Sequence, residues 1–127
     1  MKLVIYPKSP KTNGNGRLPV KIFTIDGKEH DYSIDPRKVR SVEVIASLKY
    51  NKYFMVIEYD TKAQNFDLYE KSARFAEELL RQLHIKCRPI ITIKSTRYKV
   101  YVDNNGLKFE KLPNVKLDPD EEWLKYE

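Results

Sequence analysis

Three cations and one aromatic ring lie close together in the C-terminal third of the chain, and their types suit contact with a nucleic acid. Lys94, Arg97, Lys99 and Tyr101 lie in and beside a predicted turn. A lysine or arginine neutralises a phosphate, whereas a tyrosine ring offers a base a flat surface on which to stack. These residues therefore predict a surface for single-stranded DNA or RNA.

Cations before and within the central part of the chain could extend such a surface. Lys49 and Phe54 lie on opposite strands of a hairpin predicted for 40–60, so a base could stack on the ring while the cation holds its phosphate. Further candidate phosphate contacts lie just before the central strands: Arg37, Lys38 and Arg40. All of these cations have an alternative role as solvated surface groups, because long basic side chains stay hydrated at little cost.

Acidic residues on the same hairpin suggest a different chemistry. The expected strand pairing places Glu43 opposite Asp60, with Glu58 nearby and Lys62 two positions further on. Carboxylates beside a lysine match the arrangement in which many nucleases hold a metal ion, although such a set arises easily in a chain that is one-third charged. There is no glycine-rich phosphate loop and no paired-cysteine motif, so we predict no cofactor and assign no catalytic or metal-ligating residue.

The net charge of +6 is unevenly distributed along the chain. Residues 118–127 hold five acidic side chains and one basic one, which leaves 23 basic and 13 acidic side chains, a net charge of +10, in residues 1–117. A domain with this charge attracts polyanions by long-range steering at low salt. The alternative is that the lysines only keep the surface hydrated.

The length of 127 residues suits one domain, expected to span 1–117, followed by an acidic tail over 118–127. A basic loop over 8–19, rich in glycine and asparagine, is expected to be mobile. No apolar run could span a bilayer or serve as a signal peptide, so we expect no membrane partner and a cytoplasmic location. The single cysteine, Cys87, agrees with a reducing compartment and is interpreted as a packing residue.

The residues that could do chemistry are positioned by an α+β fold, predicted as a mainly antiparallel sheet of consecutive hairpins. The predicted strands are 2–6, 20–25, 29–34, the two arms of 40–60, 66–69, 90–94, 98–102 and 107–111. Apolar residues recur at helical spacing from Ala73 to Leu83, which predicts one helix from Ser72 to about His84. Its apolar stripe should lie on the core face of the sheet.

Alternation of side chains also predicts how the strands pair. The predicted pairs on the core face are Val44 with Tyr59, Ile22 with Tyr32, and Ile93 with Val100. The same pairing leaves Phe54 on the opposite, accessible face and sets Lys94 beside Lys99. Like charges opposite each other cost stability, and a bound polyanion would relieve that cost.

These patterns favour a non-catalytic nucleic-acid-binding protein that prefers single-stranded DNA or RNA. One alternative is a protein-interaction module or assembly subunit that uses a sheet edge or Trp123 in the tail. The other alternative is the metal-dependent nuclease. The tail itself could dock Trp123 and Leu124 on the domain, or compete with nucleic acid for the basic surface.

Overall fold

A computed structural model of the protein describes residues 1–62 and 66–113. The acidic tail over 118–127, with Trp123 and Leu124, lies outside the described residues. Within the described residues the chain forms nine strands, one α-helix and one short 3-10 helix, η1. In chain order these elements are β1 (Lys2–Pro7), β2 (Leu18–Phe23), β3 (Glu29–Ile34), η1 (Pro36–Lys38), β4 (Val39–Ser47), β5 (Lys52–Tyr59), α1 (Asp67–Arg81), β6 (His84–Cys87), β7 (Ile90–Ile93), β8 (Thr96–Asp103) and β9 (Gly106–Lys111).

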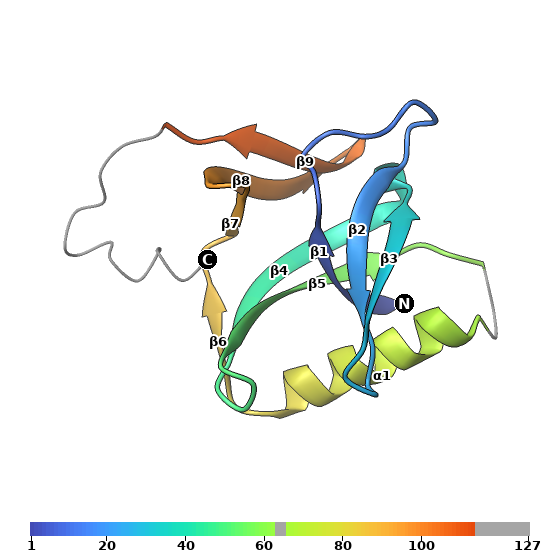
Figure 1. The fold of residues 1–127 in the computed structure, drawn as a ribbon, viewed down its shortest axis with the longest axis vertical. Coiled ribbons are helices and arrows are strands. Elements are labelled where there is room, and N and C mark those ends of the chain that lie inside the picture. Colours follow the sequence, from blue (N-terminus) through green and yellow to red (C-terminus); the bar gives the residue numbers. More distant parts are fainter. Residues whose placement is uncertain (63–65, 114–127) are drawn as a thin grey trace.

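The strands form two antiparallel sheets, which we name the large and the small sheet. The large sheet has the strand order β3-β2-β1-β5-β4-β6, and the small sheet has the order β7-β8-β9. In Figure 1 the large sheet lies between α1, at the bottom, and the small sheet, at the top. The predicted α+β fold of consecutive hairpins with one packed helix is confirmed.

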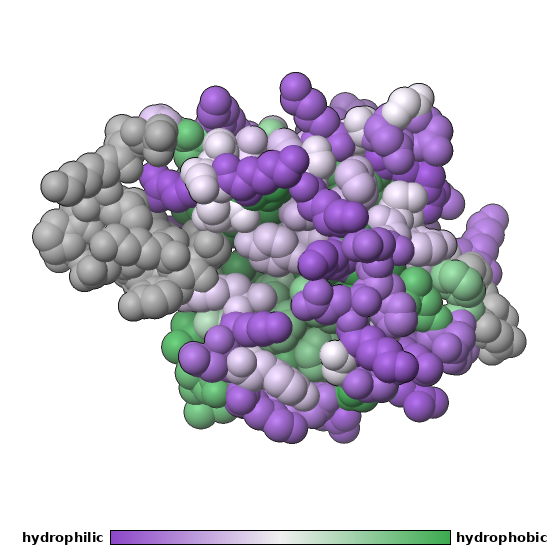
Figure 2. Space-filling model, viewed as in Figure 1, coloured by the Kyte–Doolittle hydropathy of each residue, from purple (hydrophilic) through white to green (hydrophobic). Residues whose placement is uncertain are grey.

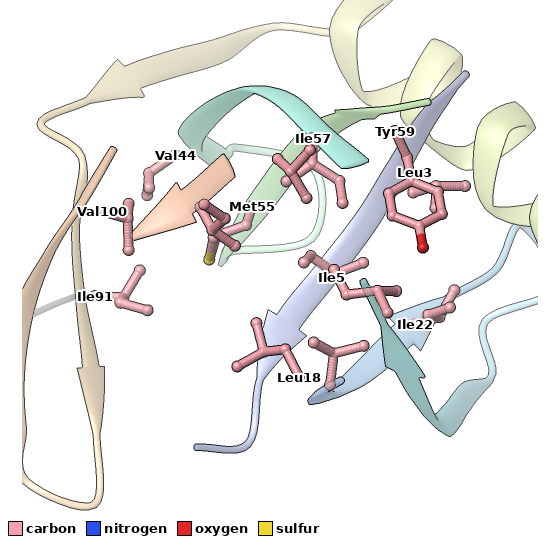
Figure 3. Packing of buried hydrophobic residues seen from close by; sticks show 14 of the residues in the cluster. Leu3, Ile5, Leu18, Ile22, Val44, Met55, Ile57, Tyr59, Ile91 and Val100 are labelled. Atoms are coloured by element: carbon pink, nitrogen blue, oxygen red, sulfur yellow. The ribbon is translucent and has the colours of Figure 1, made fainter. Parts of the chain in front are cut away.

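The main core lies between the two sheets (Figure 3). Side chains of β1, β4 and β5 on one face of the large sheet meet those of β7 and β8, and all of them are almost fully buried. The central members of this core are Leu3, Ile5, Val44, Met55, Ile57, Ile91 and Val100. Removing this much apolar surface from water is the main force that holds the small sheet onto the large one.

A second core lies on the opposite face of the large sheet, beneath the helix. Val4, Ile45, Phe54 and Val56 from the strands pack against the helix, and each strand residue is at most 4% exposed. The helix contributes Phe75, Ala76 and Leu79. The middle strands are therefore buried on both faces, which explains the uninterrupted apolar runs in β1 and β5.

The position predicted for the helix was wrong. Its stripe was expected on the face that carries Val44 and Met55, but that face belongs to the small sheet and the helix covers the reverse face. The reason is that both faces of β5 are apolar, so alternation along the strand does not say which of them a helix covers. The predicted exposure of Phe54 failed for the same reason.

The helix also begins earlier than predicted, at Asp67, so the strand expected over 66–69 is wrong. Ser72, where the helix was expected to begin, lies inside it and is completely buried. Its hydroxyl accepts a hydrogen bond from the Val4 amide at 2.9 Å. The helix ends at Arg81, and His84, expected at the helix terminus, instead begins the short edge strand β6. Cys87 on this strand packs against the main core, as predicted.

Three predicted registers differ from the structure by an even number of residues. Val44 pairs with Met55 instead of Tyr59, a shift of four, because β4 and β5 are joined by residues 48–51 and not by a two-residue turn. In the small sheet, Ile91 pairs with Tyr98. The turn between β7 and β8 is Lys94-Ser95, both with positive φ, and the register of this hairpin is also shifted by four. The register between β2 and β3 is shifted by two. Even shifts preserve the facing of every side chain, so the apolar sets of these hairpins stayed on one face.

Gly106 lies where the small sheet packs closely against η1. It begins β9 with a φ of 102°, and a β-carbon at this position would overlap the backbone carbonyl of Pro36 in η1. Only glycine lets the β8–β9 turn approach η1 this closely.

The loop expected over 8–19 ends two residues earlier, because Leu18 and Pro19 belong to β2.

We expect Gly106→Ala to destabilise the protein more than Gly27→Ala does. Both glycines have positive φ, but at Gly27 no atom beyond its own residue and its two chain neighbours lies within 4 Å of where a β-carbon would be. Backbone strain should cost about 1–2 kcal/mol in both variants, and the overlap should add about 1–3 kcal/mol at Gly106. Urea unfolding of the two variants measures the difference. Equal losses would contradict the close approach of η1 and β9.

Candidate nucleic-acid interface

The outer face of the small sheet presents cations around an exposed tyrosine. Along β8, Val100 points into the core, so Arg97, Lys99 and Tyr101 point away from it. Tyr101 is 39% exposed, and Lys108 lies directly opposite it on β9. We call these four residues, Arg97, Lys99, Tyr101 and Lys108, the outer basic face.

The cations of the outer basic face are not neutralised by an ion pair with another described residue. Within the described part of the chain, Arg97, Lys99 and Lys108 form no ion pair. The cations that do form one lie elsewhere: Lys8, Lys21, Arg37, Arg40, Lys49 and Lys71. One carboxylate, Glu110, lies opposite Lys99 on β9. Unpaired cations leave their positive potential available to an external anion.

Lys94 was predicted to lie beside Lys99, but the structure separates them. Lys99 pairs with Ile90, and Lys94 lies in the turn at the far end of the hairpin. There it lines a separate cleft of about 420 Å³ together with Lys8 and Lys21. The predicted repulsion between Lys94 and Lys99 is therefore wrong, and Lys94 belongs to this separate cleft.

Phe54 cannot stack on a base, because it is 3% exposed and lies among aromatic rings. Its ring forms edge-to-face contacts with Phe23, Tyr50 and Phe75, with centroids 5.4–6.1 Å apart. Lys49, expected beside it, instead contacts the helix: its ammonium lies 3.2 Å from the carboxylate of Glu78.

The Lys49 contact also shows in the ionisation of both groups. The hydrogen bond to Glu78 raises the pKa of Lys49, and the same bond lowers the pKa of Glu78. Both groups are close to solvent, so the pair should contribute little to stability. The Lys49–Glu78 pair connects the β4–β5 turn with α1, at the end of the molecule away from the small sheet (Figure 1).

The three cations predicted before the central hairpin have different environments. Arg37 is hydrogen-bonded to Asp35 at 3.1 Å and 3.2 Å, and this contact holds the pKa of Asp35 below its usual value. Arg40 is paired with Asp60 at 3.0 Å. Lys38 is exposed and forms no ion pair with another described residue. Arg37 nevertheless lies near the small sheet, because η1 packs against Gly106.

A cleft of about 640 Å³ connects Arg37 with the outer basic face. Three segments surround it: the loop between β1 and β2, the short helix η1, and the β8–β9 turn. The cations Lys11, Arg37 and Lys108 and the ring of Phe109 line it. We call it the basic cleft. Because Lys108 belongs to both, the outer basic face and the basic cleft form one continuous surface. Alternation along the strand predicted for 107–111 places Lys108 on the face away from the core-facing Leu107, but nothing else in the sequence marks it as a binding residue.

The acidic residues considered for a metal site do not lie as predicted. Glu43 lies opposite Val56 and not opposite Asp60, because of the register shift. Glu58 binds the N-terminal amine at 2.8 Å, and the Asp60 carboxylate is held by Arg40. Among the described residues no group of three or more histidine, cysteine or acidic side chains is placed to hold a metal ion.

Comparisons with protein-family models, with curated proteins and with solved structures found no match to this chain. No helix in the described ranges is both long enough and apolar enough to cross a membrane. The outer basic face and the basic cleft are therefore the features of the described residues that bear on function.

The two aromatic residues first considered for stacking should respond differently to truncation. Phe54→Ala removes a ring from the core beneath the helix and should lower the free energy of unfolding by about 3–5 kcal/mol. Tyr101→Ala removes an exposed ring and should change it by less than about 1 kcal/mol. Urea unfolding followed by circular dichroism measures both. A large loss in Tyr101→Ala would show that this ring supports the small sheet.

Proposed function

We propose that the protein binds single-stranded nucleic acid, DNA or RNA, on the outer basic face and in the basic cleft. The observation that carries this proposal is the set of unpaired cations, Arg97, Lys99 and Lys108, around the exposed ring of Tyr101. The cations supply attraction to phosphates, and the ring supplies a surface for a base.

The spacing of the face suits an extended strand. Alternate residues on a strand are separated by about 6.6–6.8 Å, so Arg97, Lys99 and Tyr101 offer contacts at regular intervals along β8. From Lys108 the same strand of nucleic acid could continue into the basic cleft toward Arg37 and Lys11. Phe109, which also lines this cleft, offers a second apolar surface there.

Duplex DNA suits this surface less well than a single strand. The major groove is usually entered by a helix, but α1 buries one side against the large sheet and carries acidic groups such as Glu77 and Glu78 on its polar side. A sheet face with an exposed ring instead suits unpaired bases. Single-stranded DNA and RNA both suit this surface, because both offer phosphates and unpaired bases.

A second function, a protein-interaction module, is favoured by the position of β6 at the edge of the large sheet in the described part of the chain. This strand forms the edge of the large sheet, and Ile85 on it is 56% exposed. An open edge with an apolar side chain can pair with a strand of another protein. Light scattering over a concentration series tests self-assembly through this edge, and a mass that stays monomeric at all concentrations would remove that version of the proposal.

The charge contribution is tested with a triple variant, Arg97→Ala, Lys99→Ala and Lys108→Ala. We expect the slope of log affinity against log salt, for a single-stranded oligonucleotide, to flatten by about 2 units, since each neutralised phosphate contributes about 0.7. Fluorescence anisotropy at several salt concentrations measures the slope.

The matched control is the triple variant Lys21→Ala, Arg40→Ala and Lys71→Ala. It removes the same number of charges, but from cations that already form ion pairs. Its slope should change clearly less. If the two triple variants behave alike, binding follows net charge and not the outer basic face.

The stacking contribution is tested at Tyr101. Tyr101→Ala should weaken binding of a single strand by about 1–3 kcal/mol, whereas Tyr101→Phe keeps the ring and should bind like the wild type. The same titrations with duplex DNA should show little effect of either change. If all three proteins bind single strands equally, binding depends on charge attraction and not on stacking at Tyr101.

Incubating the protein and the oligonucleotides with Mg²⁺ or Mn²⁺ tests the nuclease alternative, since cleavage by the wild type would favour it.

A further inference from the structure

An apolar groove lies at the end of the large sheet, on the far side of the molecule from the basic cleft. Ala46 lies opposite Tyr53 on one side and opposite Ile85 on the other, so three neighbouring strands place side chains in one row on one face. Together with Leu48 they line a hollow of about 370 Å³. We call this hollow the apolar groove.

The apolar groove is the uncovered continuation of the main core. Its face of the large sheet is the one that carries Val44 and Met55, which are buried under the small sheet one step further along the strands. Beyond the small sheet no described element covers this face, and Leu48 is 52% and Ile85 56% exposed. Figure 2 shows hydrophobic side chains gathered at the lower left, where Figure 1 places the β4–β5 turn and β6.

Exposed apolar side chains that gather in a groove usually mark a surface that another segment covers. The segment that covers this one should offer a large apolar side chain. Because Lys52 lines the groove and residues 1–117 carry a net positive charge, it should also be acidic.

We propose that Trp123 and Leu124 of the same chain occupy the apolar groove. They are the large apolar residues of the acidic segment 118–127, whose five carboxylates match the basic domain. Trp123 is ten residues beyond Pro113, where the described chain ends, and ten extended residues reach about 33–36 Å. A domain of this size has a radius of gyration of about 13 Å, so the groove is within reach.

The chain path also brings the two regions near each other. Only two residues separate β6, which forms one wall of the groove, from β7 of the small sheet. The described chain ends just after β9 of the same small sheet, where the Leu112 amide donates to the Arg97 carbonyl at 2.9 Å. The part of the chain that leads to Trp123 therefore departs from the small sheet, which is connected to β6 at the groove.

The test uses the fluorescence of Trp123, which is the chain's only tryptophan. In the full-length wild type we expect a blue-shifted emission and weak quenching by acrylamide. The double variant Leu48→Ser and Ile85→Ser should shift the emission to the red, toward that of the urea-unfolded chain, and increase quenching. Both replaced side chains are more than half exposed, so the fold should be retained, and circular dichroism checks this.

The matched control is Leu83→Ser, which replaces a more exposed leucine, 75% accessible, outside the groove. Its emission should equal that of the wild type. Lys52→Glu provides a second groove variant that leaves the apolar residues in place, and it should also increase quenching.

Three outcomes would overturn the proposal. The first is a wild-type emission equal to that of the unfolded chain, and the second is a blue-shifted emission that the groove variants leave unchanged. The third is quenching that decreases as protein concentration rises, which would place the Trp123 of a second copy, not of the same chain, in the groove.

Discussion

The constraint on which the rest of the structure depends is that the middle strands of the large sheet are apolar on both faces. Val4 lies between Leu3 and Ile5 on β1, and all three are completely buried. On β5, Phe54 and Val56 face the helix while Met55 and Ile57 face the small sheet. Water cannot be left on either side without a large loss of hydrophobic stabilisation, so the fold needs two covers. The helix and the small sheet are those covers.

This demand also determines where a binding surface can lie. The small sheet uses Ile91, Val100 and Leu107 to cover the core, and its strands alternate, so its other face is open to water. Cations can gather on that open face without disturbing the core. Gly106 then lets η1 approach the β8–β9 turn, which brings Arg37 near Lys108. The outer basic face and the basic cleft are thus by-products of how the core is covered.

The same demand explains the apolar groove. The small sheet does not cover the whole of the face on which it packs, since Leu48 and Ile85 at the end of that face are more than half exposed. Val44 lies under the small sheet, but Ala46 and its neighbours Tyr53 and Ile85 extend beyond it. An incomplete cover leaves an apolar strip that a further segment can complete. Basic and apolar surfaces therefore lie at different ends of the molecule, and they can be tested separately.

The sequence by itself determined which residues share a face and that one amphipathic helix exists. Period-two alternation placed Val44 with Met55 and Ile57, and placed Arg97, Lys99 and Tyr101 away from the core, because even register shifts do not change facing. The registers depended on turns whose lengths the sequence left ambiguous, such as Lys94-Ser95. Only the tertiary structure decided that Phe54 is buried, that Lys49 pairs with Glu78, and that Arg37 and Lys108 line the same cleft. These outcomes depend on which layer covers which face, and that choice comes from packing between segments far apart in the chain, which no local pattern encodes.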